Sequence, residues 1–369
     1  MTWSRCSAPP AVTLILIALF GIAGGMPQNV WADLCLVCPD GSGDFPTIQA
    51  AIDAASHGDI IELNSGTFTG PGNWDLDYLG KAITIRSAGG HAETCIIDGG
   101  GRHRGFYLHS GEFPSTVLQE VTLTNCCADD WIWNHGGAIR CEPAALTILR
   151  CIFIDNRAID GWDWGSSGGA VYSFGLATVI GCRFYGNSAT HGGALGGAFN
   201  KIQGCTFYDN RADGCGGAIY VRDMEGVIEN CTLAFNSGPC ASGIGIETST
   251  VTIERSIVAF GSGGKALDVD TGSILHCHCC DFYGNEGGDW AWPIGSFYLS
   301  QGNISEHPLF CNPLAGDFGL QETSVCAPFV APNAACDLLG AWGVNCLPAP
   351  VQTSTWGGIK ARFRPVPVR

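Results

Sequence analysis

Short runs of alternating hydrophobic and polar residues recur along most of this chain. "CTFY" at 205–208 and "AIYV" at 218–221 alternate with a period of two, which is the pattern of a strand with one buried face. Pairs of glycines and single asparagines separate the runs, and both residue types accept the positive φ angles of tight turns. The pattern therefore predicts many short strands joined by tight turns.

The alternating runs belong to a repeated unit of two phrases. The first recurs as "CIFIDN" (151), "CRFYGN" (182), "CTFYDN" (205), "CTLAFN" (231), "SIVAFG" (256) and "CDFYGN" (280), and the second as "GGAI" (136), "GGAV" (168), "GGAL" (192) and "GGAI" (216). Each unit of about 23 residues is too short for a compact domain but is long enough for one lap of a three-sided coil. Stacked laps pair every strand and bury one continuous core. We therefore predict an all-β fold, a right-handed parallel β-helix.

Equivalent residues of stacked laps should form columns. We expect an inward column of thiols, an aromatic column beside it and a column of asparagines at one turn. Buried free cysteines behave as small hydrophobic residues, although laps about 4.8 Å apart also lie within disulfide reach. All three columns indicate structure and not catalysis. Their members are Cys151, Cys182, Cys205 and Cys231; Phe153, Phe184, Phe207 and Phe282; and Asn156, Asn187, Asn210, Asn236 and Asn285.

Residues 39–70 are predicted to close the N-terminal end of the coil. "TIQAAIDAA" has apolar residues at helical spacing, with Thr47 as a possible N-cap. This opening, "DGSGDFPTIQAAI", resembles the start of pectin-lyase-like β-helix proteins, and the GGA and FxxN phrases resemble the repeats of polymorphic outer membrane proteins. The resemblance spans roughly residues 38 to 285. It implies the fold strongly and the function weakly, because one fold hosts many activities.

Catalytic signatures of the pectin-lyase-like enzymes are missing from the sequence. We find neither the Asn-Thr-Asp, Asp-Asp and Gly-His-Gly phrases of polygalacturonases nor the Gln and Asp pattern of pectin methylesterases. An Arg with the acidic trio that binds Ca²⁺ in pectate lyases is absent too. The "HGG" phrases at His135 and His191 are assigned to the glycine turn. These observations favour a protein without enzymatic activity.

The segment order predicts an exported protein. Arg5, the apolar run 11–23 and the small residues ending at Ala32 have the layout of a signal peptide. We expect a signal peptide at 1–32, an N-terminal cap and first lap at 33–70, the β-helix at 71–300, a C-terminal cap at 301–346 and a basic, proline-flanked tail at 347–369. The mature chain would have no membrane span and would be a monomer that is extracellular, on the cell surface or periplasmic.

Composition indicates which binding partners are disfavoured and whether the cysteines form disulfides. The 34 acidic residues outnumber 18 basic ones and give a net charge of −16, which disfavours nucleic acid. Twenty cysteines agree with export, since disulfides persist outside the cytosol. Two local bridges, Cys311–Cys326 and Cys336–Cys346, would staple the C-terminal cap, and Cys35 and Cys38 would be bridged at the other end. At "LHCHCCD" (275–281) His and Cys alternate between opposite strand faces, so we expect no metal site there.

Two insertions break the repeat and are the candidate ligand site. "CADDWIWNH" (127–135) and "RAIDGWDWGSS" (157–167) interrupt the same corner of neighbouring laps, so they should lie side by side. Tryptophan faces stack on sugar rings while carboxylates bind hydroxyls or Ca²⁺, and Ca²⁺ is the one cofactor that this chemistry suggests. The alternative is that the tryptophans fold back onto the wall of the coil. The candidate ligand-binding residues are Asp129, Asp130, Trp131, Trp133, Asp160, Trp162, Asp163 and Trp164.

Three functions follow from these features. The leading hypothesis is a bacterial cell-surface β-helix protein for adhesion or glycan binding, whose partner is a poly- or oligosaccharide or the cell envelope. The second is a polysaccharide lyase or glycoside hydrolase, with Asp130 and Asp163 as its weak catalytic candidates. The third is a purely architectural surface protein.

Overall fold

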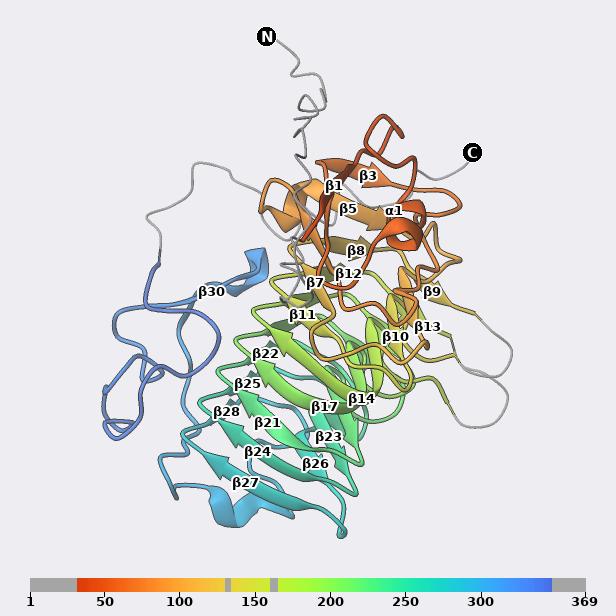
Figure 1. The fold of residues 1–369 in the computed structure, drawn as a ribbon. Coiled ribbons are helices and arrows are strands. Elements are labelled where there is room, and N and C mark those ends of the chain that lie inside the picture. Colours follow the sequence, from red (N-terminus) through yellow and green to blue (C-terminus); the bar gives the residue numbers. More distant parts are fainter. Residues whose placement is uncertain (1–31, 130–133, 160–164, 347–369) are drawn as a thin grey trace, which may run out of the picture.

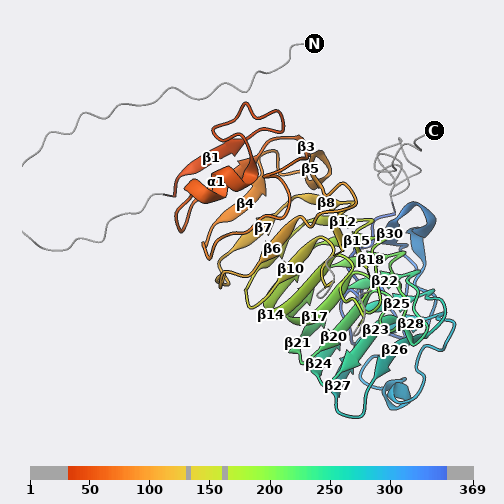
Figure 2. The ribbon, with the colours of Figure 1, turned by 90° about the vertical axis from the view of Figure 1, so that its right-hand side faces the viewer.

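The computed structural model describes residues 32–129, 134–159 and 165–346, and in this part the chain is a parallel β-solenoid (Figures 1 and 2). Its strands form three parallel sheets that run along the solenoid. Residues equivalent in the repeat pair directly across laps, as Phe184 with Phe207 and Phe207 with Leu233 do. The stacking of the repeated units is therefore confirmed.

The first sheet is the largest, and its outer face carries the candidate functional site described below. In its later laps one side of the coil is crossed by two short strands or by one long strand that bends. Its strands are β1 (Leu34–Val37), β2 (Ile60–Leu63), β4 (Thr84–Ser87), β6 (Phe106–Leu108), β7 (Val117–Gln119), β10 (Ile139–Cys141), β11 (Thr147–Leu149), β14 (Val171–Ile180), β17 (Leu195–Gln203), β20 (Ile219–Arg222), β21 (Glu225–Glu229), β23 (Ala241–Glu247), β24 (Thr250–Glu254), β26 (Lys265–Val269) and β27 (Ile274–His278).

Two smaller sheets complete each lap. The second sheet contains β3 (Gly66–Phe68), β5 (Cys95–Asp98), β8 (Thr122–Thr124), β12 (Ile152–Ile154), β15 (Arg183–Tyr185), β18 (Thr206–Tyr208), β22 (Thr232–Ala234), β25 (Ile257–Ala259) and β28 (Asp281–Tyr283). The third contains the two-residue strands β9 (Cys127–Ala128), β13 (Arg157–Ala158), β16 (Ser188–Ala189) and β19 (Arg211–Ala212). Strands this short suit a corner, where the chain must turn within a few residues.

The interior holds the expected columns. Phe153, Phe184 and Phe207 stack with 4.8 Å between successive ring centroids, which matches the spacing of laps. The amide of Asn156 donates to Asn187 Oδ1 at 3.0 Å, and Asn187 donates to Asn210 at 2.9 Å. Such a buried chain satisfies amide groups that would be costly to leave unpaired. Asn210 continues the column to Asn236, and Asn285 accepts a hydrogen bond from the backbone of Gly261.

The column of thiols is buried and reduced. Cys151, Cys182, Cys205 and Cys231 are free cysteines with no exposed surface. Each thiol donates to backbone carbonyls near the end of a strand, as Cys205 Sγ does to Gln203 O at 3.2 Å. These four cysteines therefore form no disulfide with one another, and their thiols satisfy carbonyl groups at this turn.

The N-terminal helix α1 (Ile48–Ala54) forms where the spacing of apolar residues predicts it. The side chain of Thr47 accepts a hydrogen bond from Ala50 N, so the predicted N-cap is confirmed. Ile48, Ala51 and Ile52 are buried and belong to the main core. A single-turn helix, η1 (Ala92–Thr94), precedes β5. No helix within the described ranges has the length and apolarity needed to cross a bilayer.

Residues 286–304 follow the last lap and continue its aromatic column. The ring of Trp290 stacks on Phe282 with 4.2 Å between centroids, and its indole N–H donates to Ile304 O at 2.9 Å. Ile294, in the short helix η2 (Ile294–Phe297), is buried against the main core. We call residues 286–304 the plug.

Residues 305–346, which we call the strap, run back along the side of the solenoid, whereas we expected 301–346 to close its end (Figure 1). The strap contains β29 (Phe310–Asn312), η3 (Pro313–Ala315) and β30 (Asp317–Leu320). It covers the outer face of the second sheet, where Trp342 Nε1 donates to Thr206 Oγ1 at 2.7 Å. The repeat sequence could not predict this path, because the strap has no repeat.

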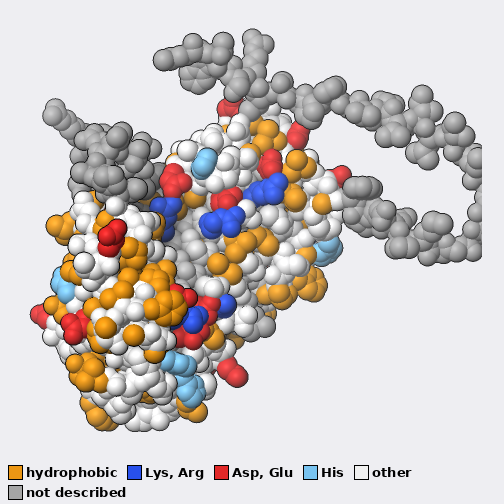
Figure 3. Space-filling view, turned by 90° about the vertical axis from the view of Figure 1, so that its left-hand side faces the viewer, with side chains coloured by type: hydrophobic (Ala, Val, Ile, Leu, Met, Phe, Trp, Pro, Cys, Tyr) orange, Lys and Arg blue, Asp and Glu red, His pale blue; other side chains and the backbone are white. Residues whose placement is uncertain are grey.

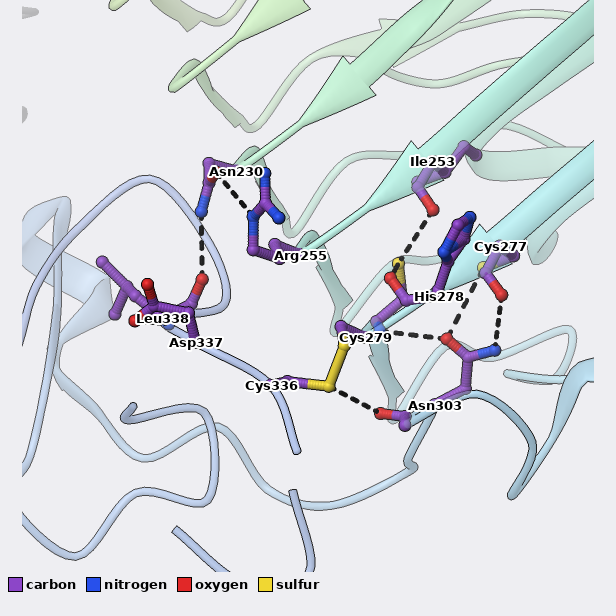
Figure 4. Close-up of a disulfide and its surroundings, with 12 residues drawn as sticks. Asn230, Ile253, Arg255, Cys277, His278, Cys279, Asn303, Cys336, Asp337 and Leu338 are labelled. Carbon is purple, nitrogen blue, oxygen red and sulfur yellow. Dashed lines mark hydrogen bonds between the residues drawn. A yellow bond between two sulfur atoms is a disulfide. The ribbon is translucent and has the colours of Figure 1, made fainter. Parts of the chain in front are cut away.

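The disulfides differ from the predicted pairs. The structure has Cys215–Cys240, Cys279–Cys336 and Cys311–Cys346, so the predicted Cys311–Cys326 and Cys336–Cys346 bridges are wrong. Cys279–Cys336 ties the strap to the last lap (Figure 4), and the nearby Asn230 side chain donates to Leu338 O. Cys326 instead is buried as a free thiol that donates to Asp281.

Cys35 and Cys38 are not disulfide-bonded, which corrects the bridge expected between them. Side chains three apart along an extended segment point to opposite sides. Cys35 Sγ accordingly lies against Ile60 O, whereas Cys38 Sγ accepts from the side chain of Asn64. Alternation along the strand therefore separates the two sulfurs.

Ion pairs between laps line one end of the first sheet. Arg86 pairs with Glu62 at 2.7 Å, and Arg150 pairs with Glu120 at 2.6 Å. Figure 3 views the molecule from the side on which the strap lies and shows acidic and basic side chains next to one another there. Partly exposed pairs of this kind contribute little individually.

Candidate functional site

The two insertions leave the solenoid from adjacent laps. Strand β9 pairs with β13, and Ile159 N donates to Ala128 O at 3.0 Å. On the return side, His135 pairs with Ser167 as an isolated parallel bridge. The flanks of the two insertions therefore lie side by side at one corner, as the repeat predicts.

Most of the predicted contact residues lie outside the described residues. Asp129 is described and is exposed to solvent. The structure gives no placement for the others, which are Asp130, Trp131, Trp133, Asp160, Trp162, Asp163 and Trp164. Their role stays a prediction from the sequence.

A groove of about 460 Å³ begins at this corner and extends over the outer face of the first sheet. Gly165 and Ser167, at the end of the second insertion, form part of its wall. Figure 2 shows the strands of its floor, β14, β17, β20 and β23, one after another along the solenoid. The side chains used below are those of His135, Tyr172, His191, Tyr220, Arg222 and Glu247.

Strand register places the floor residues in one column. Tyr172 pairs with Gly196, and Gly196 pairs with Tyr220. A side chain at Gly196 would put its Cβ 2.2 Å from Ser167 Oγ, so glycine is required at this rung. The two tyrosines are therefore separated by a rung without a side chain, which leaves the floor open between them.

Each tyrosine of the groove carries a histidine against its ring. His135 stacks on Tyr172 with 4.4 Å between centroids, and His191 lies tilted over Tyr220 at 4.8 Å. The histidines come from the corner directly before the glycine pairs, and the tyrosines follow on the next strand. The glycine turn thus positions both members of each pair.

Backbone hydrogen bonds select the tautomer that each imidazole adopts when it is neutral. His135 Nδ1 accepts from Ser167 N at 3.0 Å, and His191 Nδ1 accepts from Cys215 N at 3.2 Å. An imidazole whose Nδ1 accepts a hydrogen bond carries its proton on Nε2 when neutral. Burial, with Arg140 and Arg104 nearby, lowers the pKa of His135 from 6.5 to about 4. His135 is therefore a neutral donor at neutral pH.

The far end of the groove is charged. The hydroxyl of Tyr220 donates to Glu247 Oε2, and burial together with this carboxylate raises the pKa of Tyr220. Arg222 Nε lies 4.0 Å from Glu247 Oε1 and 3.7 Å from Asp223 Oδ2. The groove thus offers aromatic faces, the imidazole donor of His135 and a mixed charged rim.

Sequence reasoning missed this groove. His135 and His191 were assigned to the glycine turn alone, and Tyr172 and Tyr220 were not singled out. The available signal was the first outward residue after each GGA phrase, which is Arg140, Tyr172, Gly196 and Tyr220 in successive laps. Outward positions do not face the core of the solenoid, so two aromatic residues there indicate either a covering segment or a binding surface.

The family comparison agrees with the fold. Residues 137–304 match the family described as "Right handed beta helix region". With the three stacked parallel sheets, this match identifies the fold of the chain as a right-handed parallel β-helix. The groove and both insertions begin within or directly before the matched range.

Among solved structures, the chain is similar to a pectin methylesterase from carrot at 10% sequence identity. The alignment covers 77% of this chain and 91% of that chain, with a TM-score of 0.29. A likeness of this size carries no argument about activity. No curated protein matches the chain.

Proposed function

We propose that this protein is an exported bacterial β-helix protein that binds a poly- or oligosaccharide and serves in cell-surface adhesion or glycan binding. Its binding surface is the groove together with the adjoining tryptophan-bearing insertions. The observation that supports this most is the pair of histidine–tyrosine stacks on an otherwise open floor. Concave sites with aromatic faces and a few fixed polar groups are typical of small-molecule and sugar recognition.

The fixed imidazole of His135 favours binding over catalysis. A general base must present an unprotonated atom to the ligand, whereas neutral His135, whose Nδ1 accepts from Ser167 N, carries its proton on Nε2. Glu247 already accepts a hydrogen bond from Tyr220. The described groove is thus better suited to holding hydroxyl and ring oxygens than to abstracting a proton. A lyase or hydrolase would have to use the insertion carboxylates Asp130 and Asp163.

A binding and cleavage assay on one set of polysaccharides tests the proposal. The purified chain is incubated with neutral and acidic polysaccharides, with and without Ca²⁺, while bound ligand, reducing ends and unsaturated uronate are measured. We expect binding without cleavage. We also expect the Tyr172→Ala/Tyr220→Ala variant to lose at least tenfold in affinity, since two stacking faces disappear.

The matched control is Trp292→Ala, because Trp292 is aromatic and 76% exposed but lies on the plug. It should bind as the wild type does. A variant with alanine at Trp131, Trp133, Trp162 and Trp164 separates the insertions from the groove. New reducing ends or unsaturated products would instead establish the enzyme, and the absence of any binding would leave the architectural function.

A further inference from the structure

Cys215, Cys240 and Asp268 come together from successive laps beyond the far end of the groove. Their sulfur and carboxylate oxygen atoms all lie within 4.8 Å of one another. In the described part of the chain, no other group of three His, Cys, Asp or Glu side chains meets this condition. In the structure Cys215 and Cys240 form a disulfide, which is independent of the strap.

The separation between the Cys240 sulfur and the Asp268 carboxylate already suits a zinc ion, whereas the two sulfurs, which are bonded to each other in the disulfide, would have to move apart on reduction. Cys240 Sγ lies 3.4 Å from Asp268 Oδ2. Zn–S bonds of about 2.3 Å and Zn–O bonds of about 2.0–2.2 Å at a tetrahedral angle require a sulfur–oxygen separation of roughly 3.5 Å. Two thiolates on one zinc stand roughly 3.8 Å apart, and laps spaced by about 4.8 Å allow this.

The surroundings leave room for the site and balance its charge. A Cβ at Gly245 would lie 2.9 Å from Cys215 Sγ, so the missing side chain makes space for this sulfur. Lys265 Nζ lies 2.8 Å from Asp268 Oδ1, whereas the other carboxylate oxygen, Oδ2, faces the cysteine sulfurs. Two thiolates, one carboxylate and one ammonium carry a net charge of about −2, which a zinc ion neutralises.

We infer that Cys215, Cys240 and Asp268 bind one Zn²⁺ ion in the dithiol state of the protein, with water as the fourth ligand. A phosphine reductant with one water molecule converts the disulfide into two thiols as the phosphine becomes its oxide. Zinc then displaces the two thiol protons. The site needs no sugar and stands apart from the proposed function.

Cobalt and zinc titrations of the full chain test the inference. After reduction with a phosphine, we expect one equivalent of Co²⁺ to produce sulfur-to-metal charge-transfer absorption and tetrahedral ligand-field bands, both abolished by Zn²⁺. The oxidised chain should show neither. Asp268→Asn keeps the shape but replaces the carboxylate with an amide and should weaken metal binding at least tenfold, as ligand loss does.

Two serine double variants locate the site. Cys215→Ser/Cys240→Ser should lose the signal, whereas Cys311→Ser/Cys346→Ser should retain it, because that pair has no third ligand nearby among the described residues. No cobalt signal in the reduced chain, an unchanged signal in Cys215→Ser/Cys240→Ser, or wild-type affinity in Asp268→Asn would each overturn the inference.

Discussion

The outer faces of the first and second sheets are built from the same laps but are finished differently. On the second sheet the strap covers the aromatic residues, and the ring of Phe318 lies 5.3 Å from that of Tyr208. On the first sheet nothing in the described chain covers the corner groove, and Phe174 at its edge is 64% exposed. One face is closed by the protein itself and the other is left open.

This difference separates structural aromatic residues from candidate binding residues. Aromatic residues beneath the strap gain burial from the fold. The groove tyrosines are only partly buried and stack on histidines whose hydrogen bonds fix them in place. Exposed apolar groups held rigidly in a concave surface are typical of interaction sites.

Removing the disulfide that holds the strap should have the largest effect on the stability of the protein. The Cys279–Cys336 disulfide closes a loop of 57 residues, for which loop-closure entropy gives about 4 kcal/mol. We expect Cys279→Ser/Cys336→Ser to lower the free energy of unfolding by about this amount in denaturant titrations. Glycan affinity should stay unchanged, because the groove lies on the other sheet. A loss of binding in the folded variant would mean that the two faces are coupled.

Stability measured as a function of pH should reveal the buried carboxyl group of Asp281 beneath the strap. Burial raises the pKa of Asp281 from 3.8 to about 7, and Cys326 of the strap donates to its Oδ2. Because ionisation of Asp281 is harder in the folded chain, the contribution of Asp281 to stability is greatest at low pH and falls as pH rises from about 4 to 7. The wild type should lose on the order of 4 kcal/mol relative to Asp281→Asn across this window. Parallel pH profiles for the two proteins would contradict this expectation.

His135 in the groove should make stability change with pH in the opposite direction. Its pKa of about 4 lies below the ordinary 6.5, so the unfolded chain takes up a proton first as pH falls. The stability contributed by neutral His135 is therefore fully present above pH 6.5 and is lost toward pH 4, by at most about 3 kcal/mol relative to His135→Asn. Chemical denaturation at several pH values measures this loss of stability. Parallel pH profiles of unfolding for the wild type and His135→Asn would contradict this expectation.

The sequence predicts the packing inside the solenoid far better than the segments that cover its outer faces. Phe184, Phe207 and their equivalents must repeat because each rung packs on the next, so their spacing reveals the fold. The path of the strap depends on contacts such as Trp342 with Thr206, which are 136 residues apart in sequence. No local pattern encodes such a contact, and the pairing of Cys336 depends on it.

The candidate site was only partly predictable for a related reason. The insertions stand out because they interrupt the period, and the register of β9 with β13 places their flanks together. Tyr172 and Tyr220 keep the period and differ from Arg140 and Gly196 only in side chain. Recognising them requires knowing which face of the strand is outward and uncovered.

Trp290 has a consequence for how this protein can change length. Its ring ends the column of Phe153, Phe184 and Phe207 by stacking on Phe282, and the helix α1 belongs to the first laps. Both ends are thus made by non-repeating segments, while the middle laps contact mainly their neighbours. Duplication or loss of one whole unit near residue 230 would preserve both terminators but would shift the strap contacts of Thr206 and Asn230 relative to Cys279. A change in the number of laps there must therefore be matched by a change in the strap, although neither end needs to be redesigned.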